Sequence, residues 1–297
     1  MNPIIKGYLQ LTRPANLPTS AADILAGIAI SGFFLTSSQE SSLGWLTVLL
    51  LMGSSVLLYA SGVVLNDVFD YRLDLVERPE RPIPSGVVSL TSAAIFGGAL
   101  MVLGILAAFW VGITSGVIAL GLGASILMYD TLGKHHSFFG PLNMGLCRGF
   151  NLLLGMSILG NLIHWQYAII PIAYIAAITL ISRGEVHGDN KKHILLAAML
   201  YVMVVLTITI ILLYTGQNIL ISLPFILLFT LLIFRPLLKA YKENSPHNIK
   251  MAVKAGVISI IVLDAALATG FSYWWVGVLT LLLLPLSIFL SKLFAVT

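Results

Sequence analysis

Ten stretches of the chain are apolar over a length that can cross a lipid bilayer, and this feature restricts the possible folds more than any other. Each stretch is continuous and rich in Leu, Ile and Ala, whereas the strands of a membrane β-barrel alternate apolar and polar residues. A helix satisfies its own backbone hydrogen bonds in lipid, so the stretches predict transmembrane helices. They are residues 17–35, 44–66, 91–111, 114–130, 140–160, 165–182, 194–214, 219–238, 251–270 and 273–293.

The composition agrees with a membrane protein. Of the 297 residues, 58% are hydrophobic and 9% are charged, so the chain carries more apolar surface than one soluble core can hide. No long Pro-, Gly- or Ser-rich linker separates two parts, and we expect residues 1–297 to form a single domain. The predicted fold is an all-α, polytopic transmembrane helical bundle. The single cysteine, Cys147, excludes an internal disulfide framework and a cysteine-built metal site.

Lys and Arg in the loops predict the orientation, because they lie in every second loop only. The alternate loops carry neither residue, and one crossing more or fewer would scramble this pattern, so it favours ten spans over nine. Positive residues stay on the cytoplasmic side, and we therefore expect both termini and the carboxylate-rich loops to be cytoplasmic. The net charge of +4 is mostly this topological bias, so we predict no nucleic-acid partner.

The first carboxylate-rich loop begins where the second span ends. If the helix continues through it, Asn66, Asp67, Asp70 and Asp74 present four oxygen-bearing side chains on one face. Carboxylates that close repel one another unless a divalent cation neutralises them, and a ligand set of oxygens alone favours Mg²⁺. The sequence therefore predicts a magnesium site at the end of this span.

Three arginines, Arg72, Arg78 and Arg81, follow this cluster at once. Carboxylates bind phosphate only through a metal, whereas guanidinium groups meet phosphate oxygens directly and bidentately. The combination of a metal-binding face and nearby arginines suits a diphosphate ligand.

A second loop carries a similar set of residue types. Glu185 and Asp189 are four residues apart, which on a helix would place them one turn apart and suit a second Mg²⁺. Lys192 follows with a further positive charge for phosphate. Tyr129 and Lys134 close the fourth span, and Lys134 is the only basic residue of its loop, where we expect it to reach the leaving group.

Three ionisable residues, Asp23, Arg148 and Asp264, lie inside predicted spans. A charge in hydrocarbon costs about 2.5–3.5 kcal/mol on insertion scales, so we expect these side chains to face a cavity or one another. Two roles stay open for Arg148: it lines a substrate pocket, or it forms an interhelical polar pair that fixes packing.

The run from Asn66 to Gly86, NDVFDYRLDLVERPERPIPSG, resembles the first signature of the UbiA superfamily of intramembrane prenyltransferases. The EVHGD segment is similar to the second aspartate motif of that family, and YDTLGK is similar to its tyrosine and lysine region. Within the superfamily the chain looks most like the bacterial EboC-like branch. Two departures stand out: Glu185 replaces the usual first aspartate of the second motif, and ten spans exceed the nine helices common in the family.

The resemblance implies nine or ten helices around a central cavity that is capped by cytoplasmic motif loops. It implies Mg²⁺-assisted ionisation of a prenyl diphosphate to an allylic cation, which an aromatic or other lipophilic acceptor then attacks, and a place in the bacterial inner membrane. Residues and resemblance together assign catalysis to Asp67, Asp70 and Lys134, substrate binding to Asn66, Arg72, Arg81, Tyr129, Arg148 and Lys192, and metal ligation to Asn66, Asp67, Asp70, Asp74, Glu185 and Asp189.

Two other functions remain as alternatives. A transporter would use Asp23, Arg148 and Asp264 along a polar path, but its ionisable groups should then concentrate near the bilayer midplane. A catalytically silent relative would bind an isoprenoid without transferring it, and the substitution at Glu185 keeps this alternative open.

Overall fold

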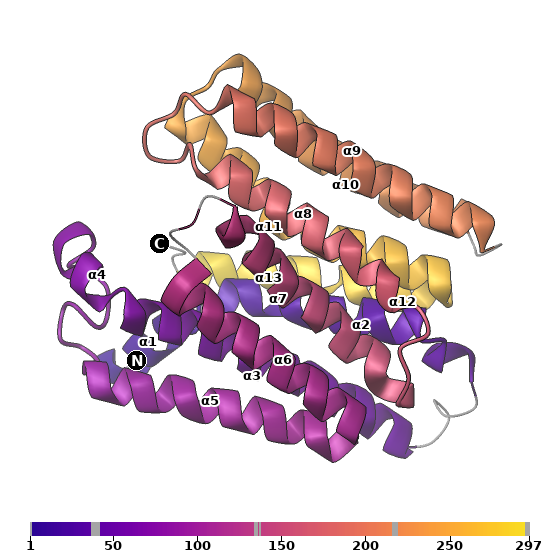
Figure 1. Cartoon of the computed structure of the whole chain (residues 1–297), viewed down its shortest axis with the longest axis horizontal. Helices are drawn as coiled ribbons and strands as arrows, with labels where there is room; N and C mark the ends of the chain where they lie inside the picture. Colours follow the sequence, from indigo (N-terminus) through magenta and orange to yellow (C-terminus); the bar gives the residue numbers. More distant parts are fainter. Residues whose placement is uncertain (1, 37–41, 134–135, 137, 216–218, 295–297) are drawn as a thin grey trace.

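The chain folds into a bundle of long helices, as the apolar stretches predict. The computed structural model describes all residues except 1, 37–41, 134–135, 137, 216–218 and 295–297, and the described residues contain helices and turns but no strand. Figure 1 shows helices α3, α5 and α6 on one side of the bundle and helices α8 to α11 on the other, with α2 and α7 between them. The helices are α1 (Pro3–Leu11), α2 (Leu17–Ile30), α3 (Ser42–Phe69), α4 (Tyr71–Glu77), α5 (Leu90–Val111), α6 (Ile113–Met128), α7 (Phe139–Met156), α8 (Ile169–Ser182), α9 (Lys191–Tyr214), α10 (Ile219–Lys242), α11 (Pro246–Phe271), α12 (Trp274–Leu281) and α13 (Leu283–Leu293).

Nine of the ten predicted spans coincide with helical segments that are long and apolar enough to cross a membrane, counted over the described residues. The first predicted span, 17–35, is the exception, because α2 has 14 residues and is about 21 Å long at about 1.5 Å per residue. All of its residues after Leu17 are buried. It is therefore an interior helix, shorter than predicted, that packs against α3, α7 and α11.

The last predicted span, 273–293, is not one helix but two, α12 and α13, which meet at Leu282. Pro285 is the third residue of α13 and has no backbone N–H to donate to the preceding turn, so a continuous helix is broken here. Helix α1 lies at the end of the bundle that carries α4 (Figure 1).

Exposed aromatic side chains mark the opposite end of the bundle. Trp110, Trp165, Tyr214 and Trp274 are all exposed, and they lie next to the loops that lack Lys and Arg. Trp and Tyr are enriched where a membrane meets water. Their position agrees with a multi-pass membrane protein in which one end of the bundle carries basic loops and the other carries exposed aromatic residues.

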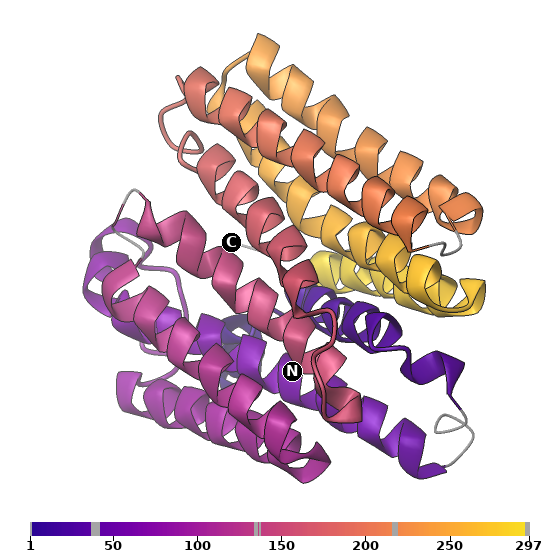
Figure 2. The ribbon, with the colours of Figure 1, turned by 45° about the vertical axis from the view of Figure 1, so that its right-hand side comes forward.

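Helices α2 and α7 cross closely because each presents a glycine at the crossing. A Cβ atom at Gly155 would lie 2.5 Å from the backbone oxygen of Ile24, and one at Gly27 would collide with the backbone oxygen of Leu152. Small residues let the backbones of membrane helices approach one another. The crossing fixes α2 against α7, as Figure 2 shows from a second direction.

This crossing makes a stability prediction. Gly27→Ala should lower the melting temperature of the purified protein, because overpacking costs about 1–3 kcal/mol and the obstructing atoms belong to the backbone. Gly53→Ala on α3 is the matched control, since a Cβ atom there meets nothing within 4 Å and alanine is the better helix former. Equal melting temperatures for the two variants would contradict the close crossing.

Candidate functional site

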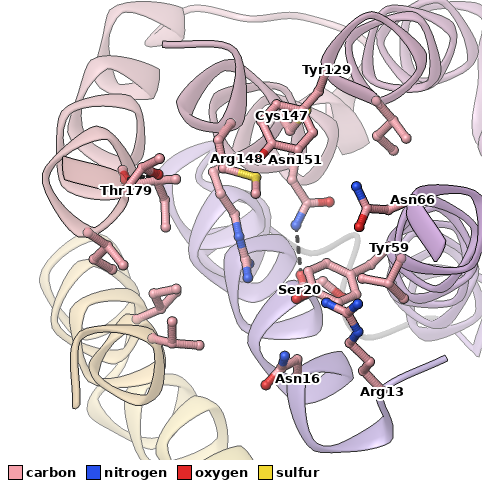
Figure 3. A pocket seen from close by; sticks show the side chains of 18 of the residues that line it. Arg13, Asn16, Ser20, Tyr59, Asn66, Tyr129, Cys147, Arg148, Asn151 and Thr179 are labelled. Atoms are coloured by element: carbon pink, nitrogen blue, oxygen red, sulfur yellow. Dashed lines mark hydrogen bonds between the residues drawn. The ribbon is translucent and has the colours of Figure 1, made fainter. Parts of the chain in front are cut away.

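A cavity of about 410 Å³ lies between α2, α3, α6, α7, α8 and α11 (Figure 3). One wall is apolar and is built from α6, α8 and α11. The other wall carries polar side chains from the start of α2, from α3 and from α7. Three of the predicted site residues line the cavity, namely Asn66, Tyr129 and Arg148. The apolar wall includes Leu122, Ile126, Ile175, Ile178, Val257 and Ile260.

The first carboxylate-rich loop starts as a near continuation of α3. Helix α3 ends at Phe69, Asp70 forms a turn, and α4 begins at Tyr71. The backbone N–H of Asp70 still donates to the oxygen of Asn66, and that of Asp74 to the oxygen of Asp70, both at 2.9 Å. The predicted four-residue spacing is thus kept through the turn. Asp67 and Asp74 are buried, while Asp70 and Asn66 are half-buried.

The buried carboxylates of this loop are bound to arginines. Asp67 Oδ1 accepts from Arg13 Nη2 at 2.7 Å and from Arg81 Nη1 at 3.1 Å. The same Arg81 nitrogen donates to Asp74 Oδ2 at 2.7 Å. Arg81 is buried with the two carboxylates, whereas the side chain of Arg13 is 27% exposed and lines the cavity. Arg81, which the sequence assigned to substrate binding, thus contacts predicted metal ligands.

The side chains of this loop offer the oxygen atoms that Mg²⁺ prefers, but these atoms do not surround a single metal position. All of its ligands are oxygens, as a hard divalent cation requires. Within the part of the chain that the structure describes, however, no three His, Cys, Asp or Glu residues converge closely enough to hold a metal ion. In this arrangement Asp67 and Asp74 turn toward arginines, and their role with Asp70 as metal ligands stays a prediction.

A π-helical turn, Tyr129–Gly133, follows α6 and brings a further carboxylate to the cavity. The amide nitrogen of Asn66 donates to Asp130 Oδ1 at 2.9 Å, and Asp130 is buried. Such irregular turns recur at functional sites, where they redirect side chains. Lys134, the predicted leaving-group contact, lies outside the described residues.

The second loop does not form the helical turn that was predicted for it. Helix α8 ends at Ser182, residues 183–187 form turns, and α9 starts only at Lys191. Gly188 and Asp189 have positive φ angles of 73° and 49°, which a right-handed helix excludes. The four-residue spacing of Glu185 and Asp189 therefore does not correspond to one helical turn.

The side chains of the second loop differ in burial. Glu185 is half-buried, whereas Asp189 and Lys192 are exposed. Burial raises the pKa of the Glu185 carboxyl, and the positive charges of Lys250 and Arg78 act to lower it. Arg78 belongs to the first loop, so a charge of the first loop acts on a carboxyl of the second.

Asn190, which was not predicted as a site residue, holds the second loop to the bundle. Its amide nitrogen donates to the backbone oxygens of Leu180 and Ile181, each at 3.0 Å, and thus satisfies carbonyls at the end of α8. Its backbone N–H donates to Asn244 Oδ1 at 2.8 Å. The loop is therefore anchored both to α8 and to the segment before α11.

Arg148 forms an interhelical ion pair, which is one of the two roles left open by the sequence, and it also lines the cavity, where a role toward substrate stays a prediction. Its Nη1 atom donates to Asp23 Oδ2 at 2.7 Å, and its Nη2 atom donates to Thr19 Oγ1 at 2.6 Å. Asn151 also donates to Asp23 Oδ2 at 2.7 Å. The Arg148 guanidinium lies 5.3 Å from the ring centre of Tyr59, a further lining residue (Figure 3).

Arg13 lines the cavity but was not predicted as a site residue, because the sequence analysis counted it only among the basic residues that indicate orientation. It adopts a left-handed backbone conformation, with φ 46° and ψ 65°, directly before the 3₁₀ turn Pro14–Asn16. Such a conformation is strained for a residue with a side chain and often occurs at functional sites. No local pattern marks it, because its partner Asp67 is 54 residues away.

These features define a polytopic helical membrane protein with a central cavity that reaches an arginine–carboxylate cluster at one end of the bundle. The chain belongs to the UbiA prenyltransferase family, whose sequence profile matches residues 25–253. The resemblance noted for the NDVFDYRLD segment is thereby confirmed at the level of the family, whereas the EboC-like placement stays a prediction.

The chain is similar in sequence to several archaeal proteins named digeranylgeranylglyceryl phosphate synthase. It is 36% identical over 157 residues to one from Methanococcoides burtonii, a match that covers 52% of this chain and 56% of the relative. It is 31% identical over 198 residues to one from Saccharolobus solfataricus, covering 64% of this chain and 67% of the relative. The chain thus spans little more than half the length of the first relatives it matches.

Solved structures show the same fold at low sequence identity. A digeranylgeranylglyceryl phosphate synthase in membranes superposes with a TM-score of 0.68 at 23% identity, covering 90% of this chain and 98% of that one. A UbiA homologue from Archaeoglobus fulgidus bound to GPP and Mg²⁺ gives a TM-score of 0.68 at 16% identity, covering 88% and 99%. The helical arrangement is therefore that of known UbiA structures.

The Arg148 ion pair predicts a rescue experiment. Arg148→Gln should destabilise the protein by about 3–5 kcal/mol, because it leaves the buried Asp23 carboxylate without its counterion. Adding Asp23→Asn to the same variant should restore much of the loss, since no unpaired charge is then created at this pair. Unfolding in detergent measures both effects, and a double variant no more stable than Arg148→Gln would refute the pairing.

Proposed function

We propose that the protein transfers a prenyl group from a prenyl diphosphate to a lipophilic acceptor within the membrane. The observation that carries this proposal is the cavity, which is apolar along one wall and ends beside Arg13, Asn66 and the paired carboxylates. An apolar chain with an anionic head matches such a cavity. Membership of the UbiA prenyltransferase family supports the same reaction.

The residues of the chain divide this task between them. The apolar wall takes the hydrocarbon and keeps water away from a carbocation, while arginines near the carboxylates attract the diphosphate. We propose Asn66, Asp67, Asp70 and Asp74 as ligands of one Mg²⁺ and Glu185 with Asp189 as ligands of another. When bound, Mg²⁺ would supply positive charge that stabilises the leaving diphosphate. Arg72, Lys134 and Lys192 are proposed to act on the same diphosphate.

The acceptor is suggested by the relatives. Their name describes a glyceryl phosphate that carries two geranylgeranyl groups. We therefore propose a prenylated glyceryl phosphate as the first acceptor to test. An isoprenoid-binding relative without transferase activity is the second candidate, and the arginines that occupy Asp67 and Asp74 are the observation that favours it.

We propose further that both termini and the motif loops face the cytoplasm. The absence of Lys and Arg from the alternate loops supports this orientation. The EboC-like resemblance suggests a bacterial inner membrane, whereas the relatives named above come from archaea.

The proposed transfer reaction can be tested directly. Purified protein supplied with geranylgeranyl diphosphate and geranylgeranylglyceryl phosphate should release diphosphate and label the acceptor, and chelation of Mg²⁺ should stop both. The measurement is product analysis by mass spectrometry. Binding of the diphosphate without any release, over donors of several lengths, would support the silent relative instead.

The first motif makes a further prediction. Asp70→Asn should lower turnover by about a hundredfold or more, because it removes a proposed ligand whose charge offsets the metal. Glu80→Gln is the matched control, since Glu80 is an exposed carboxylate of the same loop with no proposed role, and its rate should be unchanged. Full activity of Asp70→Asn would remove Asp70 from the site.

Orientation is tested by cysteine labelling. In a Cys147→Ala background, a cysteine at Asn161 should react with a membrane-impermeant maleimide in intact cells, and one at Glu80 only after permeabilisation. Both positions are exposed, so accessibility depends on the side of the membrane. The reverse pattern would invert the proposed topology.

A further inference from the structure

Two carboxylates of the first motif, those of Asp67 and Asp74, already have positive partners that belong to the chain itself. Asp67 and Asp74 contribute two negative charges, and Arg13 with Arg81 contributes two positive ones. Both carboxylates and Arg81 are buried, so water does little to screen them. The charges of these four side chains therefore balance one another.

A divalent cation arriving alone would disturb this balance. It would compete with the guanidinium groups for Asp67 and Asp74, and a displaced Arg81 would be left buried without a partner. An unpaired buried charge is strongly unfavourable. Mg²⁺ by itself should therefore bind weakly at this motif.

A diphosphate removes the obstacle, because it offers the displaced arginines a new partner. Guanidinium groups bind phosphate oxygens as well as they bind carboxylates, in bidentate geometry. Arg13 is well placed for such a change, since its side chain is partly exposed and lines the cavity beside Asn66 (Figure 3). The side chain of Arg81 is only 8% exposed, so we expect it to reach the diphosphate after Arg13 does.

We infer that Arg13 and Arg81 exchange partners, from the carboxylates Asp67 and Asp74 to the diphosphate, when Mg²⁺ takes over the carboxylates. Mg²⁺ and diphosphate then bind together, and each binds poorly without the other. The inference rests on the proposed function, because it concerns the same metal and diphosphate. It adds a coupling between the two ligands and assigns Arg13 to that coupling.

Two simpler roles for the arginines make different predictions. If Arg81 only clasps the loop, its removal weakens the binding of Mg²⁺ and of diphosphate alike. If it only binds diphosphate, its removal leaves the affinity for Mg²⁺ alone unchanged. Partner exchange predicts that the two affinities change in opposite directions. Without the arginine, Mg²⁺ alone binds more tightly, and diphosphate in the presence of Mg²⁺ binds more weakly.

The experiment compares wild type, Arg81→Gln and Arg13→Gln by isothermal titration of the full-length protein in detergent. One titrant is Mg²⁺ alone, and the other is inorganic diphosphate in saturating Mg²⁺. Each arginine variant should bind Mg²⁺ alone severalfold more tightly than wild type and bind diphosphate about tenfold or more weakly, the loss typical of a charged hydrogen bond. Arg235→Gln on α10 is the matched control, because Arg235 is exposed and far along the chain from the motif, and both affinities should match wild type.

Folding provides a second readout, since Arg81→Gln leaves two buried carboxylates without that counterion. Mg²⁺ alone should raise the melting temperature of this variant more than that of wild type. An unchanged or weaker affinity of both variants for Mg²⁺ alone, while wild type binds Mg²⁺-diphosphate, would overturn the exchange and leave the proposed function standing. Wild type that binds neither titrant would overturn both.

Discussion

The arrangement of this protein depends on the pairing of charges away from water. A buried charge must have a partner, and the partners here come from distant parts of the chain. Arg148 on α7 pairs with Asp23 on α2, and Arg13, just before α2, pairs with Asp67 at the end of α3. Helix α2 is thereby tied at two levels to the helices that enclose the cavity. Its close glycine crossing with α7 brings Asp23 within reach of Arg148.

The helices were predictable because their signal is local, but the pairings were not. A run of apolar residues and a loop of basic ones can be read within a few tens of residues, and nine of the ten spans follow from them in the described chain. Arg148 and Asp23 are 125 residues apart, and nothing in the sequence between them indicates which intramembrane charges meet. Periodicity also failed at Glu185 and Asp189, because α8 ends at Ser182 and the backbone at Gly188 and Asp189 has positive φ angles.

Helix α13 supports the site from outside the segment that matches the family. Ser287 on α13 donates to the backbone oxygen of Ala15 at 2.6 Å, in the short turn that follows Arg13. The family match ends at residue 253, before α12 and α13 begin. Through this hydrogen bond, the second helix of the final predicted span holds the turn that follows Arg13, the residue that pairs with Asp67.

The ion pairs of Arg13 and Arg81 stabilise the first carboxylate-rich loop and also limit the binding of a metal ion to its carboxylates. Carboxylates this close repel one another unless a positive charge lies between them, and in this arrangement Arg13 and Arg81 supply that charge. A cation that binds the carboxylates displaces the arginines, which then need another negatively charged partner. A diphosphate is such a partner, whereas a metal ion alone is not. The arginines that follow the aspartates in the sequence then act together with them in binding metal and diphosphate. They keep the motif folded, and they make the binding of the metal conditional on the binding of the anion.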